Sequence, residues 1–196
     1  MHKMNEKIAQ YFMKLLETEK RCDEVTAATV RYAILTLLDG SEKFLLLSLM
    51  YGFFYDVGRF YLAFAALISL RRYMGGSHRE TWLGCLLSSV VNFGVILGLS
   101  DLFTVPVPAT GGLALLLALE IVLWVPLASP QQLRCTEQRR RKMQRKSFAA
   151  LAVWACITPF LPAELANVVF WAWAFQAAEV LLVALYRCGA VTVKMK

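Results

Sequence analysis

Three long apolar segments constrain what this chain can fold into more than any other feature of its sequence. Residues 82–100, 110–128 and 165–186 each contain at most one charged residue. A helix that crosses a bilayer needs about 20 apolar residues, so each segment is long enough to span. Hydrophobic residues form 58% of the 196-residue chain and charged residues 18%, whereas soluble domains average about 45–50% and about 25%. The sequence therefore predicts a membrane protein rather than a water-soluble domain.

Three further apolar segments are shorter and interrupted: residues 43–57, 58–70 and 148–162. Together with the long segments they predict an all-α, polytopic membrane protein. We expect about six transmembrane helices within residues 41–196.

Residues 1–40 are predicted to form amphipathic helices. Apolar side chains recur at helical spacing over residues 4–16, with lysines on the polar side. This helix is expected to lie either in the membrane interface or on the cytoplasmic face of the protein itself. A second amphipathic stretch, Val25 to Leu38, is predicted to end in a turn at Asp39–Gly40.

The distribution of basic residues predicts the orientation. With six spans and a cytoplasmic N-terminus, segments 71–81, 129–147 and 187–196 lie inside and carry thirteen Lys and Arg residues. The external connections carry one, Arg59. Basic residues concentrate in cytoplasmic loops, so both termini are expected in the cytoplasm. The basic loop 129–147 lies between spans and lacks interleaved aromatic residues, which argues against nucleic acid as a partner.

The five cysteines have no regular spacing and include no CxxC pair. This argues against a disulfide framework and against a zinc site. We expect neither a metal nor a cofactor.

One group of residues in the segment 71–85 is suited to nucleophilic catalysis. His78 precedes Cys85 by seven residues, and Gly75 and Gly76 stand just before the histidine. A thiolate is the nucleophilic form of cysteine, and a neighbouring imidazole favours it and can later protonate a leaving amine. On a continuous helix these side chains would lie about 10 Å apart, beyond hydrogen-bond reach. The glycine pair is therefore predicted to break the helix.

From the residues alone, alternatives stay open. A cysteine in an apolar span is commonly a small packing residue, and a histidine beside arginines is commonly solvated. The chain could then be a non-catalytic small transporter or scaffold. Glu120 and Glu179 lie inside apolar segments, where ionisable residues are functional candidates.

The run Arg71-Arg72-Tyr73-Met74-Gly75-Gly76-Ser77-His78, with Cys85 seven positions after the histidine, resembles the accessory gene regulator B (AgrB) family. These proteins are membrane cysteine endopeptidases that process the quorum-sensing propeptide AgrD. The position between the glycine pair and the histidine is often aromatic in the family and is Ser77 here. The similarity extends to the length, the polar N-terminal helices and the basic loop.

The resemblance implies that Cys85 is the nucleophile and His78 the general base and then the general acid. It implies a thioester between Cys85 and the truncated peptide, followed by cyclisation to a thiolactone or lactone. Supporting or substrate-binding roles are implied for a further set: Arg71, Arg72, Gly75, Gly76 and Arg79. The implied partners are an AgrD-like propeptide, membrane lipids and a second copy of the chain. The implied location is a bacterial cell membrane, with the active site at the cytoplasmic face.

Overall fold

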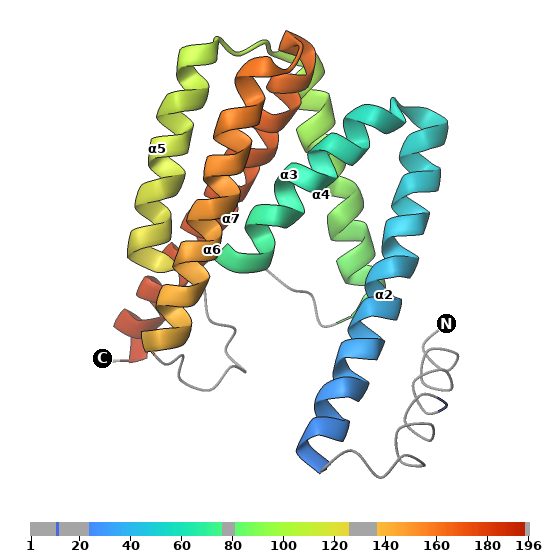
Figure 1. Ribbon diagram of the computed structural model, residues 1–196, viewed down its shortest axis with the longest axis vertical. Coiled ribbons are helices and arrows are strands. Elements are labelled where there is room, and N and C mark those ends of the chain that lie inside the picture. Colours follow the sequence, from blue (N-terminus) through green and yellow to red (C-terminus); the bar gives the residue numbers. More distant parts are fainter. Residues whose placement is uncertain (1–10, 12–23, 76–80, 126–136, 195–196) are drawn as a thin grey trace. The chain divides into compact units, whose positions relative to one another are not determined.

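The computed structural model describes residues 11, 24–75, 81–125 and 137–194, and the regular elements within these ranges are all helices (Figure 1). The elements in chain order are α2 (Glu24–Phe54), α3 (Val57–Met74), α4 (Trp82–Leu102), α5 (Val107–Trp124), α6 (Glu137–Ile157), the short 3-10 helix η1 (Thr158–Phe160) and α7 (Ala163–Lys194). The predicted all-α class is confirmed. The chain forms two compact units, Met1–Tyr55 and Asp56–Lys196, which are described separately.

The first unit contains α2, one continuous helix that passes through the position of the predicted turn at Asp39–Gly40. The prediction of a turn was wrong because local contacts carry the helix through this point. Lys43 Nζ lies 2.6 Å from Asp39 Oδ2, and such i, i+4 ion pairs stabilise a helix by about 0.2–0.5 kcal/mol. The predicted division at residue 40 thus falls inside α2. The predicted amphipathic helix over residues 4–16 lies outside the described residues except for Tyr11.

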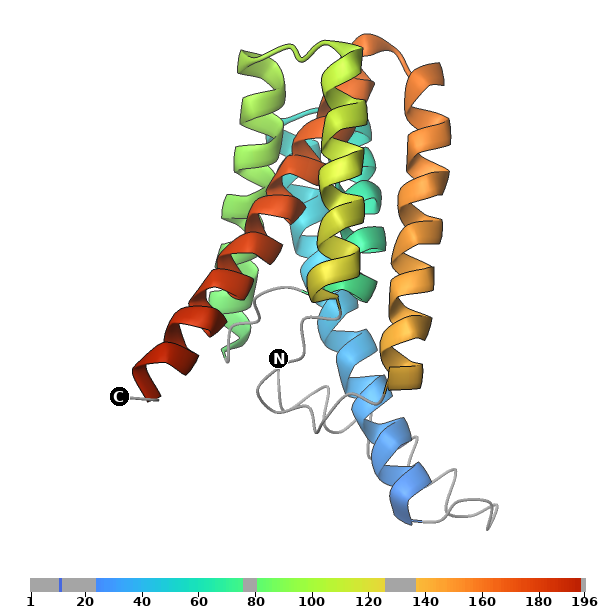
Figure 2. The same ribbon diagram turned by 90° about the vertical axis from the view of Figure 1, so that its left-hand side faces the viewer.

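The second unit is organised around α7, which packs against α3, α4 and α5, while α6 packs on α3 and α5 (Figure 2). The buried side chains of α7 recur at helical spacing. They include Val168, Val169, Ala172, Trp173 and Gln176, which are all fully buried. Because α7 touches three other helices, residues on its buried face can hold the ends of those helices.

At one end of the second unit, polar side chains join three helices. Arg59 of α3 binds Asp101 of α4 at 2.6 Å and Glu164 of α7 at 2.8 Å. The buried amide of Asn167 donates to the carbonyl of Ser100 at 2.6 Å. Helix ends leave backbone groups without intrahelical partners, and contacts of this kind satisfy them.

Two helices of the described residues are long and apolar enough to cross a membrane: Trp82–Leu102 and Ala163–Tyr186. They coincide with the predicted third and sixth segments. The fourth corresponds to a shorter apolar helix, Pro108–Trp124. Apolar side chains at every fourth position of α4 are exposed, namely Leu83, Leu87, Val91 and Val95. A continuous exposed apolar stripe is typical of a surface that contacts lipid or protein, so these helices indicate a membrane protein. The count of six spans and the positions of the termini stay predictions.

The basic segment predicted as a loop over residues 129–147 is helical from Glu137 onward. This part of the prediction was wrong because its polar side chains make helix-compatible contacts. Glu137 binds Arg141 four residues away at 3.2 Å. Gln144 donates to the carbonyls of Ile121 at 3.1 Å and Val122 at 3.2 Å, and these carbonyls belong to the last turn of α5. Residues 129–136 lie outside the described residues.

Candidate functional site

Helix α3 ends at Met74 because Gly75 leaves the helical conformation. Gly75 has φ 92° and ψ −177°, a combination that is essentially restricted to glycine. Its N–H still donates to the carbonyl of Arg71 at 2.9 Å and closes the last turn of the helix. The break that the glycine pair predicts is therefore present at its first residue. Gly76, His78 and Arg79 lie outside the described residues.

Cys85 lies in the first turn of α4, directly after the segment that carries His78. Thr81 caps this helix, since its Oγ1 accepts from the N–H of Gly84 at 3.2 Å. The N–H of Cys85 donates to the carbonyl of Thr81 at 3.0 Å. The Cys85 thiol is free, and the residue is partly exposed. Unpaired N–H groups give the start of a helix partial positive charge, which favours an anion there.

The two predicted arginines occupy different environments. The Arg71 guanidinium donates to Glu179 Oε1 on α7 at 2.8 Å. Their side chains are only 18% and 9% exposed. Arg72 is exposed. Arg71 thus joins α3 to α7, and Arg72 is the one that a ligand or lipid can reach.

Gln176 is a residue that the sequence did not single out. It is fully buried in α7, and its Nε2 donates to the carbonyl of Gly75 at 3.1 Å. The available signal was the pair Gln176 and Glu179, two polar residues three positions apart in the otherwise apolar stretch 168–183. Polar residues inside apolar spans are costly and mark functional candidates.

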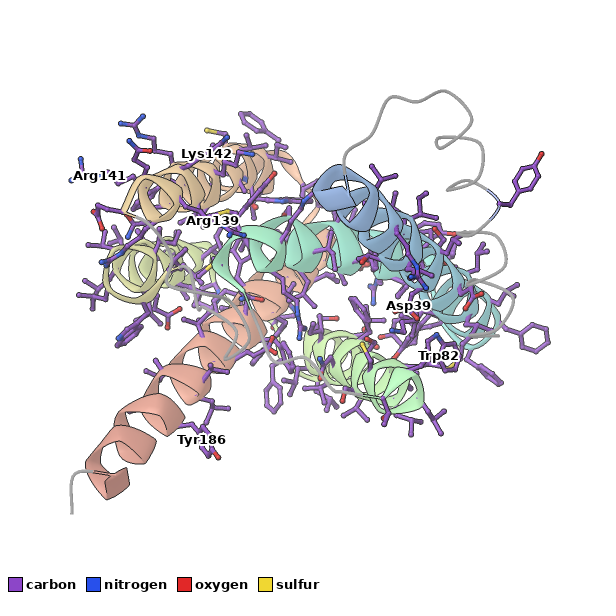
Figure 3. All side chains as sticks on the ribbon, turned by 90° about the horizontal axis from the view of Figure 1, so that it is seen from below. Asp39, Trp82, Arg139, Arg141, Lys142 and Tyr186 are labelled. Atoms are coloured by element: carbon purple, nitrogen blue, oxygen red, sulfur yellow. The ribbon has the colours of Figure 1, made fainter. Side chains whose placement is uncertain are left out.

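The basic part of α6 lies at the same end of the second unit as Gly75. Lys146 Nζ stands 5.6 Å from the ring centroid of Tyr73, a cation–π contact between α6 and α3. On the first turns of α6, Arg139, Arg141 and Lys142 are exposed (Figure 3). Exposed positive charge on α6 therefore lies at the end of the unit where the chain leaves α3. Among the described residues, no group of three or more His, Cys, Asp or Glu could hold a metal ion.

Comparison with known proteins adds to this geometry. The sequence model of the family Accessory gene regulator B matches residues 5–180. An AgrB-like protein of Clostridium beijerinckii is 32% identical over 74 residues, which are 38% of this chain and 37% of the relative. The match thus spans just over a third of that relative's length. No solved structure matches the chain. The family match covers most of the sequence, from the N-terminal segment into α7, and the chain belongs to the accessory gene regulator B family.

Proposed function

We propose that this protein is an integral-membrane cysteine endopeptidase that cleaves an AgrD-like propeptide at its C-terminal processing site and promotes its cyclisation. One observation carries the proposal. Cys85 stands partly exposed in the first turn of an apolar helix, directly after a segment that leaves α3 at Gly75 and contains His78. Family membership supplies the substrate class.

In the proposed reaction, Cys85 Sγ attacks the carbonyl carbon at the processing site, while His78 accepts the thiol proton. The peptide C–N bond then breaks, and His78 passes its proton to the leaving amine. The truncated propeptide stays attached to Cys85 as a thioester. A cysteine or serine within the peptide then attacks this thioester, while His78, neutral again, accepts the proton of the attacking group and Cys85 leaves as the thiolate. The product is a macrocyclic thiolactone or lactone.

The membrane location supports ring closure over hydrolysis. Exchange of one thioester for another is nearly isoenergetic, whereas water would discharge the activated acyl group irreversibly. A site that excludes water protects the reactive intermediate. Cys85 is followed by the apolar length of α4, with Leu83 and Leu87 exposed on either side of it in sequence. This apolar environment favours attack on the Cys85 thioester by a nucleophile within the peptide over attack by water.

Charge supports a mode of substrate binding. AgrD-type propeptides combine an amphipathic helix with an acidic tail, and the exposed Arg72 and the basic turns of α6 would attract that tail. Arg79 would add to the same positive surface. The same residues would contact anionic lipid, which contributes about 1 kcal/mol per basic side chain near the surface. Under the positive-inside rule this end of the protein faces the cytoplasm of a bacterial cell. The proposal includes that two copies of the protein form a homodimer.

The test is cleavage of the cognate propeptide by the protein reconstituted in liposomes. We expect a shortened, cyclised product and a hydroxylamine-sensitive protein–peptide adduct. Cys85→Ala should abolish both, and His78→Ala should abolish or strongly reduce both. Cys156→Ala is the matched control, because Cys156 is also a free thiol, exposed in the apolar last turns of α6, and it should retain activity. Cleavage that survives Cys85→Ala would overturn the proposal.

A further inference from the structure

Two polar side chains of α7 hold the last turn of α3. Gln176 Nε2 donates to the carbonyl of Gly75 at 3.1 Å, and Glu179 Oε1 accepts from Arg71 Nη2 at 2.8 Å. Gln176 and Glu179 are three positions apart, so they project from the same face of α7. Their partners on α3 are four positions apart and lie at its end. The last turn of α3 is thus fixed at two points by residues more than one hundred positions away in sequence.

The contact at Gly75 fixes the backbone at the end of α3. The N–H of Gly75 is bound to the carbonyl of Arg71 at 2.9 Å, and its C=O is bound by Gln176. Both polar backbone groups of Gly75 are therefore hydrogen-bonded, the N–H before its φ angle and the C=O after its ψ angle. The Gly75 carbonyl belongs to the last peptide group described at this end of α3, and its hydrogen bond to Gln176 fixes the orientation of that group.

Packing alone does not require these polar residues. Apolar side chains close to them in the sequence of the same two helices are fully buried, such as Leu70 and Met74 of α3 and Val180 of α7. A leucine at position 176 would avoid the cost of burying an amide. The amide oxygen of Gln176 is buried with no hydrogen-bond partner among the described residues, which adds to that cost. The amide of Gln176 is explained by the Gly75 carbonyl that it binds, and the carboxylate of Glu179 by the Arg71 guanidinium that it binds.

We propose that Gln176 and Glu179 are positioning residues for the reaction at Cys85. They fix the end of α3 and the peptide group of Gly75, three residues before His78. Through this contact they act on the segment that carries His78 and on the environment of the Cys85 thiol. The inference rests on the proposed function. It assigns to α7 a role in forming the site, although neither residue touches the reacting atoms.

The experiment compares Gln176→Leu with Asn167→Leu in the full-length protein. Asn167 is the matched control because it is also a buried amide of α7 that donates to backbone carbonyls, those of Ser100 and Phe103, at the opposite end of the unit. Two quantities are measured. One is acyl-enzyme formation in single turnover over a range of propeptide concentrations. The other is the rate of Cys85 alkylation by iodoacetamide as a function of pH, quantified on the Cys85 peptide by mass spectrometry.

We expect Gln176→Leu to lower the maximal acylation rate at least tenfold, with half-saturation within twofold of the parent protein. Its alkylation profile should move toward that of His78→Ala. Asn167→Leu should lower the unfolding temperature but leave both readouts within twofold. Glu179→Gln, which keeps size and removes charge, should act in the same direction by at least threefold. It also serves as the test variant if Gln176→Leu does not fold.

The inference is overturned if folded Gln176→Leu, or Glu179→Gln in its place, matches the parent protein or Asn167→Leu in both readouts. Failure of the proposed function has a different signature, because the parent protein itself would then form no acyl-enzyme. The alkylation profile needs no propeptide and still decides the question in that case. A displaced profile for Gln176→Leu supports positioning of the thiol environment by α7, and an unchanged profile refutes it.

Discussion

Replacement of Gly75 by alanine tests whether the chain must leave α3 in the conformation seen here. At φ 92° and ψ −177°, a residue with a Cβ atom is strained by about 1–3 kcal/mol. Every 1.4 kcal/mol corresponds to a tenfold change in an equilibrium constant, so the population of the native conformation at this point should fall about 5-fold to 140-fold. We expect the rate of acyl-enzyme formation by Gly75→Ala to fall by a factor in that range.

The assay is single-turnover acylation in proteoliposomes, combined with thermal unfolding of the same preparation. Gly75→Asn should be impaired to a similar degree, because asparagine tolerates the left-handed helical region but not a ψ near 180°. Gly98→Ala is the matched control. Gly98 lies inside α4, and a Cβ atom there would meet nothing within 4 Å. Alanine in a helix interior is favoured over glycine by about 0.5–1 kcal/mol, so this variant should remain active and unfold at an equal or higher temperature.

Two outcomes would refute the reasoning on Gly75. In the first, folded Gly75→Ala acylates as fast as the parent protein, which would mean that the reaction does not depend on this backbone conformation. In the second, Gly98→Ala loses as much activity as Gly75→Ala, which would mean that any added methyl group in this region is harmful and that conformation is not the cause.

Two further predictions concern stability. Arg59→Gln removes the ion pairs to Asp101 and Glu164, whose side chains are 43% and 78% exposed. The free energy of unfolding should therefore fall by less than about 1 kcal/mol per pair, and by less still at high salt. Denaturant titration at two salt concentrations measures this loss, and a loss above about 3 kcal/mol would contradict the prediction. Trp154→Phe removes the hydrogen bond from the indole Nε1 to Ser69 Oγ at 2.8 Å and should cost about 0.5–1.5 kcal/mol. In a double-mutant cycle with Ser69→Ala the two losses should not add, and full additivity would argue against a direct bond.

The elements that could be predicted from the sequence are those set by local composition. The positions of α4 and α7 follow from long, mainly apolar segments, and the end of α3 follows from a glycine. The errors arose where polar residues were interpreted without their partners. Asp39 and Gly40 are typical of a turn, but Lys43 pairs with Asp39 and the helix continues. The basic run after Glu137 is typical of a loop, but Gln144 of that run binds the last turn of α5.

The candidate site divides in the same way. Gly75 and Cys85 belong to one short motif. The helix break at Gly75 could be predicted from the glycine pair, whereas the role of Cys85 is implied by the family resemblance and stays a prediction. Gln176 could not be assigned, because its partner Gly75 is 101 positions away and only packing decides which α7 residue meets that carbonyl. The different environments of Arg71 and Arg72 could not be predicted from the sequence either. Adjacent residues on a helix point about 100° apart, and the sequence does not show which of them faces α7.

The most direct test of the central claim is the site of covalent attachment during the reaction. The reconstituted protein would be mixed with its propeptide, quenched in acid within one turnover, digested and sequenced by tandem mass spectrometry. Our account predicts that the truncated propeptide is found on Cys85 as a thioester through its new C-terminal carboxyl carbon. Attachment to another residue, or processing with no adduct on Cys85 at any time point, would contradict it.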